Sequence, residues 1–555
     1  MDHNGQITPE RNATMNIVDL KDERNRVLCT LLRAHAEASG DAPFLRADDT
    51  TFSYGRANAI VNAYARGLRE LGLGAGGRLM VYMHSCLEFV LLTLAANKLG
   101  ALWVPINTDY RGEWLVETIN ASKGAILATD VALLEKLRPV ERELHYGRLV
   151  LRGRKADARE DFAPRGVMTL EELGDRSEAE IETRHIGYGD AAAVLWTSGT
   201  TGKPKGVVQS HNVWVRAAEN NNRLYGTRAG DVAYNCLPLY NSAAWVGNIY
   251  RTLTVGIPCA LDEQFSVSRF WDRIRFYGAT QTITLGAMHM FLWNEPRRAD
   301  DADNPLRMAS MVPMPQKMIA PFCERFGLEG IVQGFGQSEA MLLLSKLETP
   351  TRQLKPNALG ELSGDMELKL LRDDGEEATT GEVGEFAVRP LAPHVIFSGY
   401  FEDPEATRSA FRGEWYCMGD LGIKDAEGNF FFVDRKKDCI RYKGRNISSL
   451  QVESVAASHP AVQAVAVYGV PSEMLESEHE IKLDAILKPG QQLLPEELAR
   501  FINEHAPYFC VPRYIEFVGE LPYTPTQKLE KYKLRAKGLS GATWDRLKSD
   551  FELQR

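Results

Sequence analysis

The chain has 555 residues, of which 44% are hydrophobic and 25% charged. These fractions are typical of a soluble globular protein, and at roughly 150 residues per domain the length allows about three to four folding units. The formal net charge of -9 argues against a nucleic-acid-binding protein, which usually carries a basic footprint. A chain of this length buries large cores and needs no disulfide or metal to hold it together.

The cysteines and the apolar stretches point to a cytoplasmic enzyme. None of the eight cysteines forms a C-x-x-C redox or zinc pair, so we expect buried thiols in a reducing compartment. Residues 1–25 contain no apolar region of a secretory signal. The longest apolar stretches, such as Phe89 to Ala96, are far short of the roughly 18 residues of a membrane span, so we expect no integral membrane segment.

Residues 1–22 are polar and non-periodic, which predicts a loose arm. From about residue 24 to 290, helical and strand-like patterns alternate, which favours α/β layers with largely parallel sheets. The first predicted elements are helices at 27–38 and 57–71, a strand at 78–83, a helix at 86–99 and a strand beginning at 101.

The residue pattern changes twice more along the chain. Short strands with Gly and Asp-Gly turns dominate from about 358 to 435, which indicates a β-rich subdomain. A basic stretch follows Asp434, and then a separate alternation of strands and helices begins. We therefore predict an α/β protein with a loose arm at 1–22 and a large N-terminal domain at 23–435. That domain would contain two α/β layered sheets and the β-rich subdomain, and residues 436–555 would form a small, mobile α+β domain.

The segment AVLWTSGTTGKPKGVVQSH, residues 193–211, is the sharpest local feature. Apolar strands flank a loop rich in Gly, Ser and Thr, and Ser210 is placed to cap a following helix. Such a loop offers backbone N–H and hydroxyl donors to phosphate oxygens. It is not a Walker A loop, because Pro204 follows Lys203 and the chain returns to a strand. A solvent-exposed hairpin is the alternative interpretation.

TSGTTGKPKG resembles the phosphate-loop signature of the adenylate-forming superfamily, which includes acyl-CoA synthetases, non-ribosomal peptide adenylation domains and firefly-type luciferases. Further matches follow in the family's order from about residue 50 to 535, which is almost the whole chain. The resemblance implies that the ATP phosphates are bound by Thr197, Ser198, Gly199, Thr200, Thr201, Gly202, Lys203 and Lys205.

GFGQSEA, residues 334–340, resembles the family's Y-G-x-T-E segment. The resemblance implies that Phe335 stacks on the adenine and that Ser338, where Thr is usual, lies near the phosphates. Glu339 would hold Mg²⁺ together with Thr200, since Mg²⁺ prefers oxygen ligands. We also expect the glycines at 334 and 336 to let the backbone approach a ligand. A turn before a helix, with Glu in its first turn, is the alternative.

Two motifs further along match the ribose and hinge segments of the family. In WYCMGDLG, residues 415–422, Asp420 is implied to accept hydrogen bonds from the ribose hydroxyls. In FFVDRKKDCIRYKGRNISSLQVE, residues 431–453, Arg435 is implied to contact the ribose and Lys437 to be the pivot of the C-terminal domain. Lys443 and Gly444 match the family's KG pair, which lines the CoA tunnel. A β-turn and a solvated basic face are the respective alternatives.

LPYTPTQKLEKYKLR, residues 521–535, resembles the segment that carries the adenylation lysine of the family. Lys528 falls at the expected place, although Gln527 replaces the usual Gly. A movable ammonium group can stabilise charge that develops in the transition state. A surface lysine is the alternative.

The chain departs from the family pattern at the acid pocket as well. In CLPLYNSAAW, residues 236–245, Asn241 stands where His is usual. The resemblance places Asn241, Trp245 and Gly286 around the acid pocket. Met311 and Val312 occupy a stretch that is commonly small and Gly-rich, so we expect them to reshape the adenine or acid-pocket wall, or to weaken nucleotide binding.

The resemblance implies an AMP-forming acid–CoA ligase, similar to carnitine-CoA-ligase-like enzymes, that uses ATP, Mg²⁺ and CoA. The carboxylate would attack the α-phosphate, and a thiol would then attack the acyl-adenylate while the C-terminal domain turns. Two alternatives stay open: a standalone enzyme that loads a carrier protein, and a degenerate nucleotide-binding protein. The acid itself stays open between fatty, aryl, steroid side-chain and betaine-type acids, and so does the oligomeric state, a homo-oligomer included.

Overall fold

The structure is a computed structural model that describes residues 18–158, 160–197, 204–286, 288–352, 354–436, 438, 440–442, 445–471, 479–523 and 529–553. The chain divides into two compact units. The first comprises Met1–Gly199, Lys203–Glu367 and Arg389–Ser409, and the second comprises Thr200–Gly202, Leu368–Val388 and Ala410–Arg555.

An eight-stranded sheet in the first unit has the order β19-β9-β8-β4-β3-β5-β6-β7. Its strands are β3 (Arg78–Tyr82), β4 (Leu102–Pro105), β5 (Ile126–Asp130), β6 (Arg148–Arg152), β7 (Val167–Thr169), β8 (Ala191–Thr197), β9 (Lys205–Ser210) and β19 (Gly399–Tyr400). The strands from β8 to β7 in this order run parallel, whereas β9 is antiparallel to β8. Residues 79–82 of β3 are fully buried, as expected for a parallel strand that is covered on both faces.

A nine-stranded sheet forms the other half of the first unit, with the order β16-β15-β14-β13-β12-β10-β11-β1-β2. Its strands are β1 (Pro43–Ala47), β2 (Thr50–Ser53), β10 (Ala233–Asn235), β11 (Cys259–Leu261), β12 (Gln281–Leu285), β13 (Met308–Val312), β14 (Gly330–Phe335), β15 (Leu344–Glu348) and β16 (Glu361–Leu362). The six strands from β14 to β1 run parallel. Their carboxyl ends therefore meet at one edge of the sheet.

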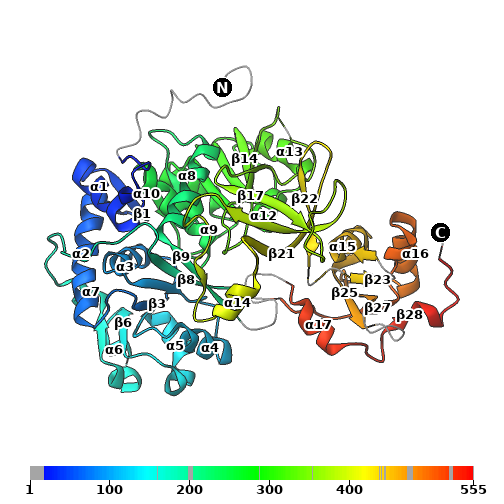
Figure 1. The fold of residues 1–555 in the computed structure, drawn as a ribbon, viewed down its shortest axis with the longest axis horizontal. Coiled ribbons are helices and arrows are strands. Elements are labelled where there is room, and N and C mark those ends of the chain that lie inside the picture. Colours follow the sequence, from blue (N-terminus) through cyan, green and yellow to red (C-terminus); the bar gives the residue numbers. More distant parts are fainter. Residues whose placement is uncertain are drawn as a thin grey trace. The chain divides into compact units, whose positions relative to one another are not determined.

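Helices pack on these sheets, and α3 shows how sequence sets their place. The helices are α1 (Leu28–Ser39), α2 (Tyr54–Glu70), α3 (Leu87–Lys98), α4 (Glu113–Ser122), α5 (Leu134–Leu137), α6 (Lys155–Ala158), α7 (Leu170–Gly174), α8 (His211–Tyr225), α9 (Ser242–Ala244), α10 (Tyr250–Val255), α11 (Phe270–Tyr277), α12 (Met288–Asn294), α13 (Gln316–Phe326) and α14 (Pro404–Ser409), with a π-helical turn, η6, at Trp245–Ile249. Nearly every residue of α3 is buried, because a helix that is apolar all round must be enclosed. In Figure 1, α2 lies between α1 and α7 and against α3.

The second unit contains an antiparallel sheet and a small α+β part. The first sheet consists of β17 (Met366–Leu371), β18 (Gly384–Pro390), β20 (Phe411–Arg412), β21 (Trp415–Lys424) and β22 (Phe430–Arg435). The α+β part contains β23 (Ile440–Tyr442), β24 (Arg445–Ile447), β25 (Val462–Pro471), β26 (His479–Leu487), β27 (Tyr514–Phe517), β28 (Trp544–Asp545), α15 (Ser449–Ala457), α16 (Pro495–His505) and α17 (Lys531–Lys537). In Figure 1, α15 and α16 lie next to β25 and β27, around a core that includes Val467, Leu483 and Ile515.

The predicted α/β class, with two layered sheets, a β-rich subdomain and a small α+β C-terminal part, is confirmed. The compact units do not divide at the predicted boundary between 435 and 436, because the β-rich strands group with the C-terminal part. The boundary at 435–436 therefore stays a prediction about where the mobile C-terminal domain begins. Val18 and Leu20, at the end of the predicted loose arm, are buried, so the part of the arm that the structure describes is packed.

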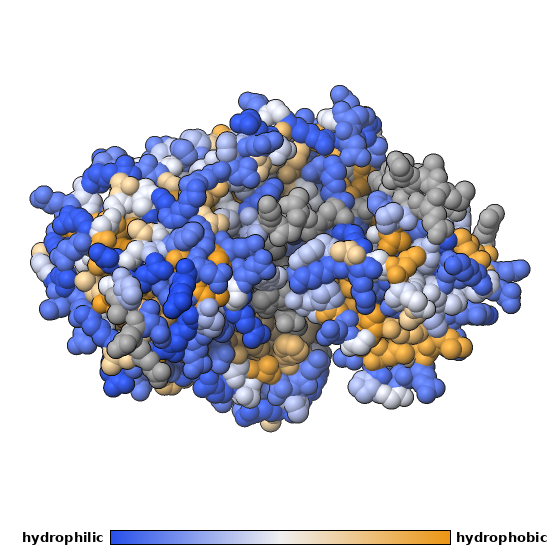
Figure 2. Space-filling view, turned by 90° about the horizontal axis from the view of Figure 1, so that it is seen from below, coloured by the Kyte–Doolittle hydropathy of each residue, from blue (hydrophilic) through white to orange (hydrophobic). Residues whose placement is uncertain are grey.

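Two observations concern the surface. Figure 2 shows a face on which hydrophilic residues predominate, with hydrophobic residues gathered in separate patches. No helix within the described ranges combines the length and the apolar character that crossing a membrane requires.

Candidate functional site

The carboxyl edge of the nine-stranded sheet gathers five of the predicted site residues that the structure describes. Asn241 follows β10, Gly286 follows β12, and Phe335, Ser338 and Glu339 lie at or just after the end of β14. Ligands bind at this edge in open parallel sheets. We call these five residues the strand-end site.

The glycine-rich segment joins two paired strands. Thr197 ends β8 and Lys205 begins β9, opposite each other in register, and the Thr197 hydroxyl donates to the Lys205 carbonyl at 3.3 Å. The predicted strand–loop–strand pattern is confirmed, as is the cap at Ser210, whose side chain accepts from the Val213 amide. Residues 198–203, the centre of the predicted phosphate loop, lie outside the described residues.

Glu339 is connected to Lys205 through an aromatic ring. The Tyr400 hydroxyl donates to Glu339 Oε1 at 3.0 Å, and Lys205 Nζ lies 4.7 Å from the centroid of the same ring. Glu339 is only 8% exposed, and its carbonyl accepts from the Phe397 amide at 2.8 Å. A cation above the ring and a carboxylate at its hydroxyl place opposite charges at one site.

Strand β9 also holds the loop after β14. The Gln209 amide nitrogen donates to the carbonyl oxygen of Ser338, and Gln209 is fully buried. Our sequence analysis missed both Gln209 and Tyr400. Tyr400 lies in a two-residue strand, β19, that pairs with β9, and no local periodicity announces so short a strand.

The glycines at the end of β14 serve the chain's own backbone. A Cβ on Gly336 would lie 2.6 Å from the Ala340 carbonyl and 2.8 Å from the Leu342 amide nitrogen, and one on Gly334 would lie 2.9 Å from Leu342 Cδ1. The close approach of the chain to itself thus favours glycine at both positions, and the approach of a ligand stays a prediction. Gly286 differs, because a Cβ there would meet no atom within 4 Å. Its positive φ of 55° favours glycine for conformational reasons.

The predicted acid-pocket residues divide into two groups. Asn241 caps α9 by accepting a hydrogen bond from the Ala243 amide at 3.0 Å, and its side chain is half-buried. Trp245 is fully buried, its indole N–H donates to the Leu239 carbonyl at 2.7 Å, and its ring lies 4.5 Å from that of Trp103. The ring of Trp245 thus belongs to an aromatic core, and its place at the acid pocket stays a prediction.

Met311 is likewise a core residue, fully buried in a cluster beneath the sheet. The effect that we expect of Met311 and Val312 on the pocket wall stays a prediction. Val312, on the opposite face of β13, is half-buried, and its carbonyl accepts from the Gly286 amide at 2.9 Å. The ends of β12 and β13 are thereby held together.

A buried carboxylate supports the strand that ends in Phe335. Glu348 on β15 has no exposed surface, and its two oxygens accept from Gln316 at 2.6 Å and from Gln333 at 2.9 Å. Lys346 Nζ lies 3.0 Å from Glu348 Oε2. The Gln333 side chain also accepts from the Met314 amide at 3.0 Å, so one network connects β13, β14 and β15.

The predicted ribose residues face each other in the second unit. Asp420 on β21 is opposite Arg435 on β22, and Arg435 Nε lies 2.9 Å from Asp420 Oδ1. Asp420 is buried and Arg435 exposed. Lys437, Lys443, Gly444 and Lys528 lie outside the described residues.

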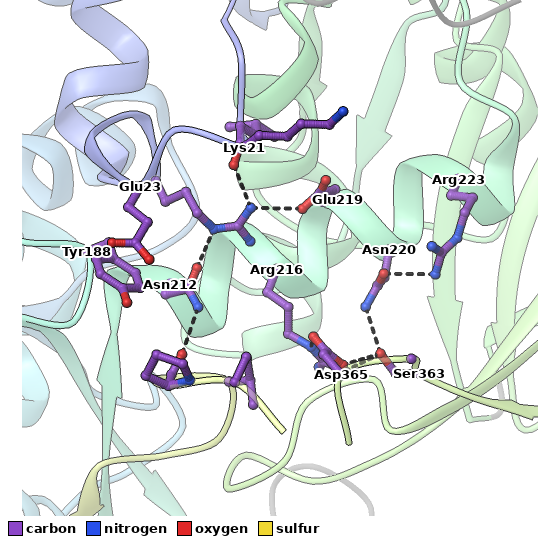
Figure 3. Close-up of a pocket in the computed structure, with 16 residues that line it drawn as sticks. Lys21, Glu23, Tyr188, Asn212, Arg216, Glu219, Asn220, Arg223, Ser363 and Asp365 are labelled. Atoms are coloured by element: carbon purple, nitrogen blue, oxygen red, sulfur yellow. Dashed lines mark hydrogen bonds and ion pairs between the residues drawn. The ribbon is translucent and has the colours of Figure 1, made fainter. Parts of the chain in front are cut away.

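A pocket of about 560 Å³ lies on the first unit, and none of its lining residues belongs to the predicted site. Figure 3 shows that its labelled polar residues come from α8, from the chain before α1 and from the segment at 363–365, together with Tyr188. Arg216 binds Asp365 and Ser363, and Asn220 also donates to Ser363. Because these side chains bind one another, we interpret the pocket as a joint between segments.

The carboxyl edge of the eight-stranded sheet carries a separate ion-pair cluster. β4 and β5 lie on opposite sides of β3, so the crevice between β3 and β5 is a topological switch point. His84 follows β3, and its Nδ1–H donates to Asp130 Oδ2 at 3.0 Å. Arg152 lies 3.5 Å from the other Asp130 oxygen.

This cluster makes a pH-dependent contribution to stability. The hydrogen bond to Asp130 raises the pKa of His84, with a further contribution from Glu263 and an opposing one from Lys136. A raised folded-state pKa stabilises the protein fully below the unfolded value of 6.5, and this stabilisation is lost as the pH rises through the folded value. We expect His84→Gln to lower stability by up to about 1 kcal/mol at low pH and by less at high pH. Melting temperatures of both proteins between about pH 5.5 and 8.5 test this, and a pH-independent difference would contradict it.

Comparisons with known proteins identify the class. The chain belongs to the AMP-binding enzyme family: the family model matches residues 32–401, and the model of the AMP-binding enzyme C-terminal domain matches residues 451–528. The predicted resemblance to the adenylate-forming superfamily is thereby confirmed.

Individual relatives cover most of the chain. The crotonobetaine/carnitine–CoA ligase of Salmonella paratyphi C is 28% identical over 493 residues, which cover 87% of this chain and 93% of that protein. The anthranilate CoA ligase AuaEII, solved with anthranoyl-AMP, has a TM-score of 0.77 and 24% identity, with 92% of this chain and 96% of that chain covered. The Mycobacterium tuberculosis fatty acyl CoA synthetase has a TM-score of 0.71 and 24% identity, with 93% and 99% covered. These two structures share the fold.

The bond between Tyr400 and Glu339 can be tested by itself. Tyr400→Phe keeps the ring beneath Lys205 and removes the hydroxyl. If Glu339 binds Mg²⁺, as the resemblance implies, the Mg²⁺ concentration needed for half-maximal activity should rise five- to tenfold, equivalent to about 1 kcal/mol. Tyr234→Phe is a matched control, because it removes a buried hydroxyl that donates to a different carboxylate, Asp262, at 2.8 Å. An equal change in both variants would contradict a role in metal binding.

Proposed function

We propose that the protein is an AMP-forming acid–CoA ligase that converts a carboxylic acid, ATP and CoA into an acyl-CoA, AMP and pyrophosphate. The observation that carries the proposal is the connection of Glu339, through Tyr400, to Lys205 at the end of the glycine-rich segment, in a chain of the AMP-binding enzyme family. The relatives named above are CoA ligases by name, which supports the same activity here.

The reaction divides into two steps. A carboxylate oxygen attacks the α-phosphorus of ATP, the bond to the bridging oxygen of the β-phosphate breaks, and pyrophosphate leaves. The thiol sulfur of CoA then attacks the acyl carbon, its proton passes to solvent, and AMP leaves. The protein contributes position and charge rather than covalent chemistry.

Each group of residues has a proposed task. The backbone and side chains of residues 197–203, with Lys205, bind the β- and γ-phosphates. Phe335 stacks on the adenine, Ser338 lies near the phosphates, and Asp420 with Arg435 binds the ribose. Lys528 stabilises the charge that develops in the first step. The C-terminal part then turns about Lys437, which brings Lys443 and Gly444 to the CoA.

The residues at the strand-end site fit a magnesium ion. Mg²⁺ is usually bound by one or two carboxylates together with substrate phosphates, and Glu339 supplies a carboxylate on the edge where the phosphates would lie. Thr200 is the second proposed ligand. When bound, Mg²⁺ would neutralise the phosphate charge. The orientation of the Glu339 side chain by the Tyr400 hydroxyl is the contribution of this chain.

The acid is the open half of the proposal. The relatives' names include a betaine-type acid, an aryl acid and a fatty acid. We propose that Asn241 and Gly286 border the acid, since one is half-buried and the other adjoins open space. We also propose a cytoplasmic location and leave the oligomeric state open.

Pyrophosphate release tests the function directly. The purified protein is incubated with ATP and Mg²⁺ and a panel of short and long fatty acids, aryl acids, bile acids and carnitine-type acids, with and without CoA. We expect release that depends on one class of acid and is stimulated by CoA. Release without stimulation by CoA would favour an enzyme that loads a carrier protein. Nucleotide binding without release for any acid would contradict the proposal and favour a degenerate binding protein.

A further inference from the structure

A buried polar network in the second unit connects β22 to α15 and to the start of α17. Asp434 is only 1% exposed, and its Oδ2 accepts from the Ser449 amide at 2.6 Å and from the Ser449 hydroxyl at 2.7 Å. The same hydroxyl accepts from Lys531 Nζ at 2.6 Å. Ser449 therefore stands between a carboxylate and an ammonium group.

The network continues beyond Lys531 and is largely buried. Lys531 Nζ also lies 2.8 Å from Glu453 Oε1, and that oxygen accepts from the Val467 amide at 2.7 Å. Burial raises the pKa of the Glu453 carboxyl. Lys531 is 7% exposed and Ser449 has no exposed surface. These hydrogen bonds are costly to break, because a buried polar group that loses its partner is left desolvated and unsatisfied.

The residues on either side of the segment 524–528, just before Lys531, are bonded to each other. Tyr523 and Leu529 form a β-bridge, and the Glu530 amide donates to the Pro522 carbonyl at 2.9 Å. The two ends of the segment 524–528, which carries Lys528 in sequence, are thus joined to each other. Lys531 connects these bonded flanking residues, which form the base of the segment, to Ser449.

Two further contacts join the same parts. The Ser448 hydroxyl donates to the Val433 carbonyl at 2.8 Å, and Arg535 on α17 lies 2.7 Å from Asp438. The residues before and after position 437 are therefore both bound to the α+β part. Asp434 immediately precedes Arg435, the proposed ribose ligand.

We infer that Ser449 and Lys531 are positioning residues, which hold the base of the Lys528 segment against strand β22 during adenylate formation and release it for thioester formation. This inference rests on the proposed function. Positions 434 and 449 lie on either side of the proposed pivot, so a rotation about Lys437 separates them, and a hydrogen bond does not survive a displacement much beyond 3.5 Å. The contact therefore belongs to one of the two catalytic states. It joins Lys531, three residues after the lysine of the first step, to strand β22 through Ser449, and we therefore assign it to that step.

The two half-reactions separate this role from a merely structural one. We expect Ser449→Ala to lower the rate of pyrophosphate formation about tenfold, and to leave thioester formation from a supplied acyl-adenylate within about twofold. Ser449→Thr, which keeps the hydroxyl, restores most of the rate. Ser458→Ala is the matched control, because Ser458 is an exposed serine at the end of the same helix. Equal losses in both half-reactions, or no loss in either, would overturn the inference.

Hydrogen exchange tests the same contact without turnover. In the wild-type protein, we expect slower amide exchange in peptides covering 445–457 and 529–537 with a non-hydrolysable ATP analogue than with AMP and CoA. In Lys531→Met, exchange accelerates in both peptides and no longer depends on the ligand. Ligand-independent exchange in the wild-type protein would overturn the inference. If no acid supports turnover while the exchange difference persists, the proposed function fails and the contact between the segments stands.

Discussion

Lys528→Ala is expected to reduce the rate of adenylate formation by about 10²–10³-fold, which is the usual cost of removing one group that stabilises transition-state charge. Thioester formation from a supplied acyl-adenylate should stay within about twofold, because AMP leaves in a step that does not use this lysine. The measurement is single-turnover pyrophosphate release, beside thioester formation from the adenylate of the same acid.

A neighbouring lysine provides the control for this variant. Lys533 lies on α17 and forms an ion pair with Glu530 at 2.6 Å, so Lys533→Ala removes a charge from the same region. We expect it to change either half-reaction by less than about threefold. If Lys528→Ala lowered both half-reactions equally, or if Lys533→Ala behaved in the same way, Lys528 would not be the adenylation lysine.

Glu348→Ala is expected to lower the free energy of unfolding by about 3–5 kcal/mol, because it leaves Lys346 as an unpaired charge in the core. Lys346 is 6% exposed, and Glu348 also binds the side chains of Gln316 and Gln333. Denaturant unfolding followed by tryptophan fluorescence measures the change. Since Gln333 precedes the strand-end site by two residues, we also expect weaker nucleotide binding.

Two further variants show whether the loss of stability in Glu348→Ala comes from the unpaired lysine. Glu361→Ala removes an exposed carboxylate from the neighbouring strand β16 and should change stability by less than about 0.5 kcal/mol. The double variant Lys346→Met with Glu348→Met should recover part of the loss, because two apolar side chains often replace a buried pair at little cost. A double variant less stable than Glu348→Ala would show that the hydrogen bonds to the glutamines, and not the lone charge, determine the effect.

Much of the fold follows from local patterns. The apolar run at 78–83 predicts β3 within one residue, and the glycine-rich segment correctly predicts a strand on each side. The predicted helix at 57–71 begins at Tyr54 in the structure, because the Ser53 side chain accepts from the Arg56 amide and caps the helix earlier. Helix starts depend on one capping bond, which a hydrophobic pattern does not register.

The site is less accessible to sequence analysis, because its decisive contacts are long-range. Glu339 and Tyr400 are 61 residues apart, and Gln209 and Ser338 are 129 residues apart. The motifs located Glu339 and Ser338, but not the side chains that hold them. Trp245 also lies in a matching motif, and the motif did not reveal that its ring packs in the core. A motif fixes a residue's position on the backbone and leaves the direction of its side chain to packing.

The aromatic core around Trp245 has an optical consequence. Trp103 belongs to β4 of the eight-stranded sheet, whereas Trp245 follows β10 of the nine-stranded sheet, and their ring centroids are 4.5 Å apart with the rings tilted by 42°. Indole transitions at this separation couple, and the coupling falls steeply as the rings move apart. The near-ultraviolet circular dichroism of the protein therefore carries a signal from the seam between the two sheets. That signal should disappear when the sheets separate, even while each sheet keeps its own strands.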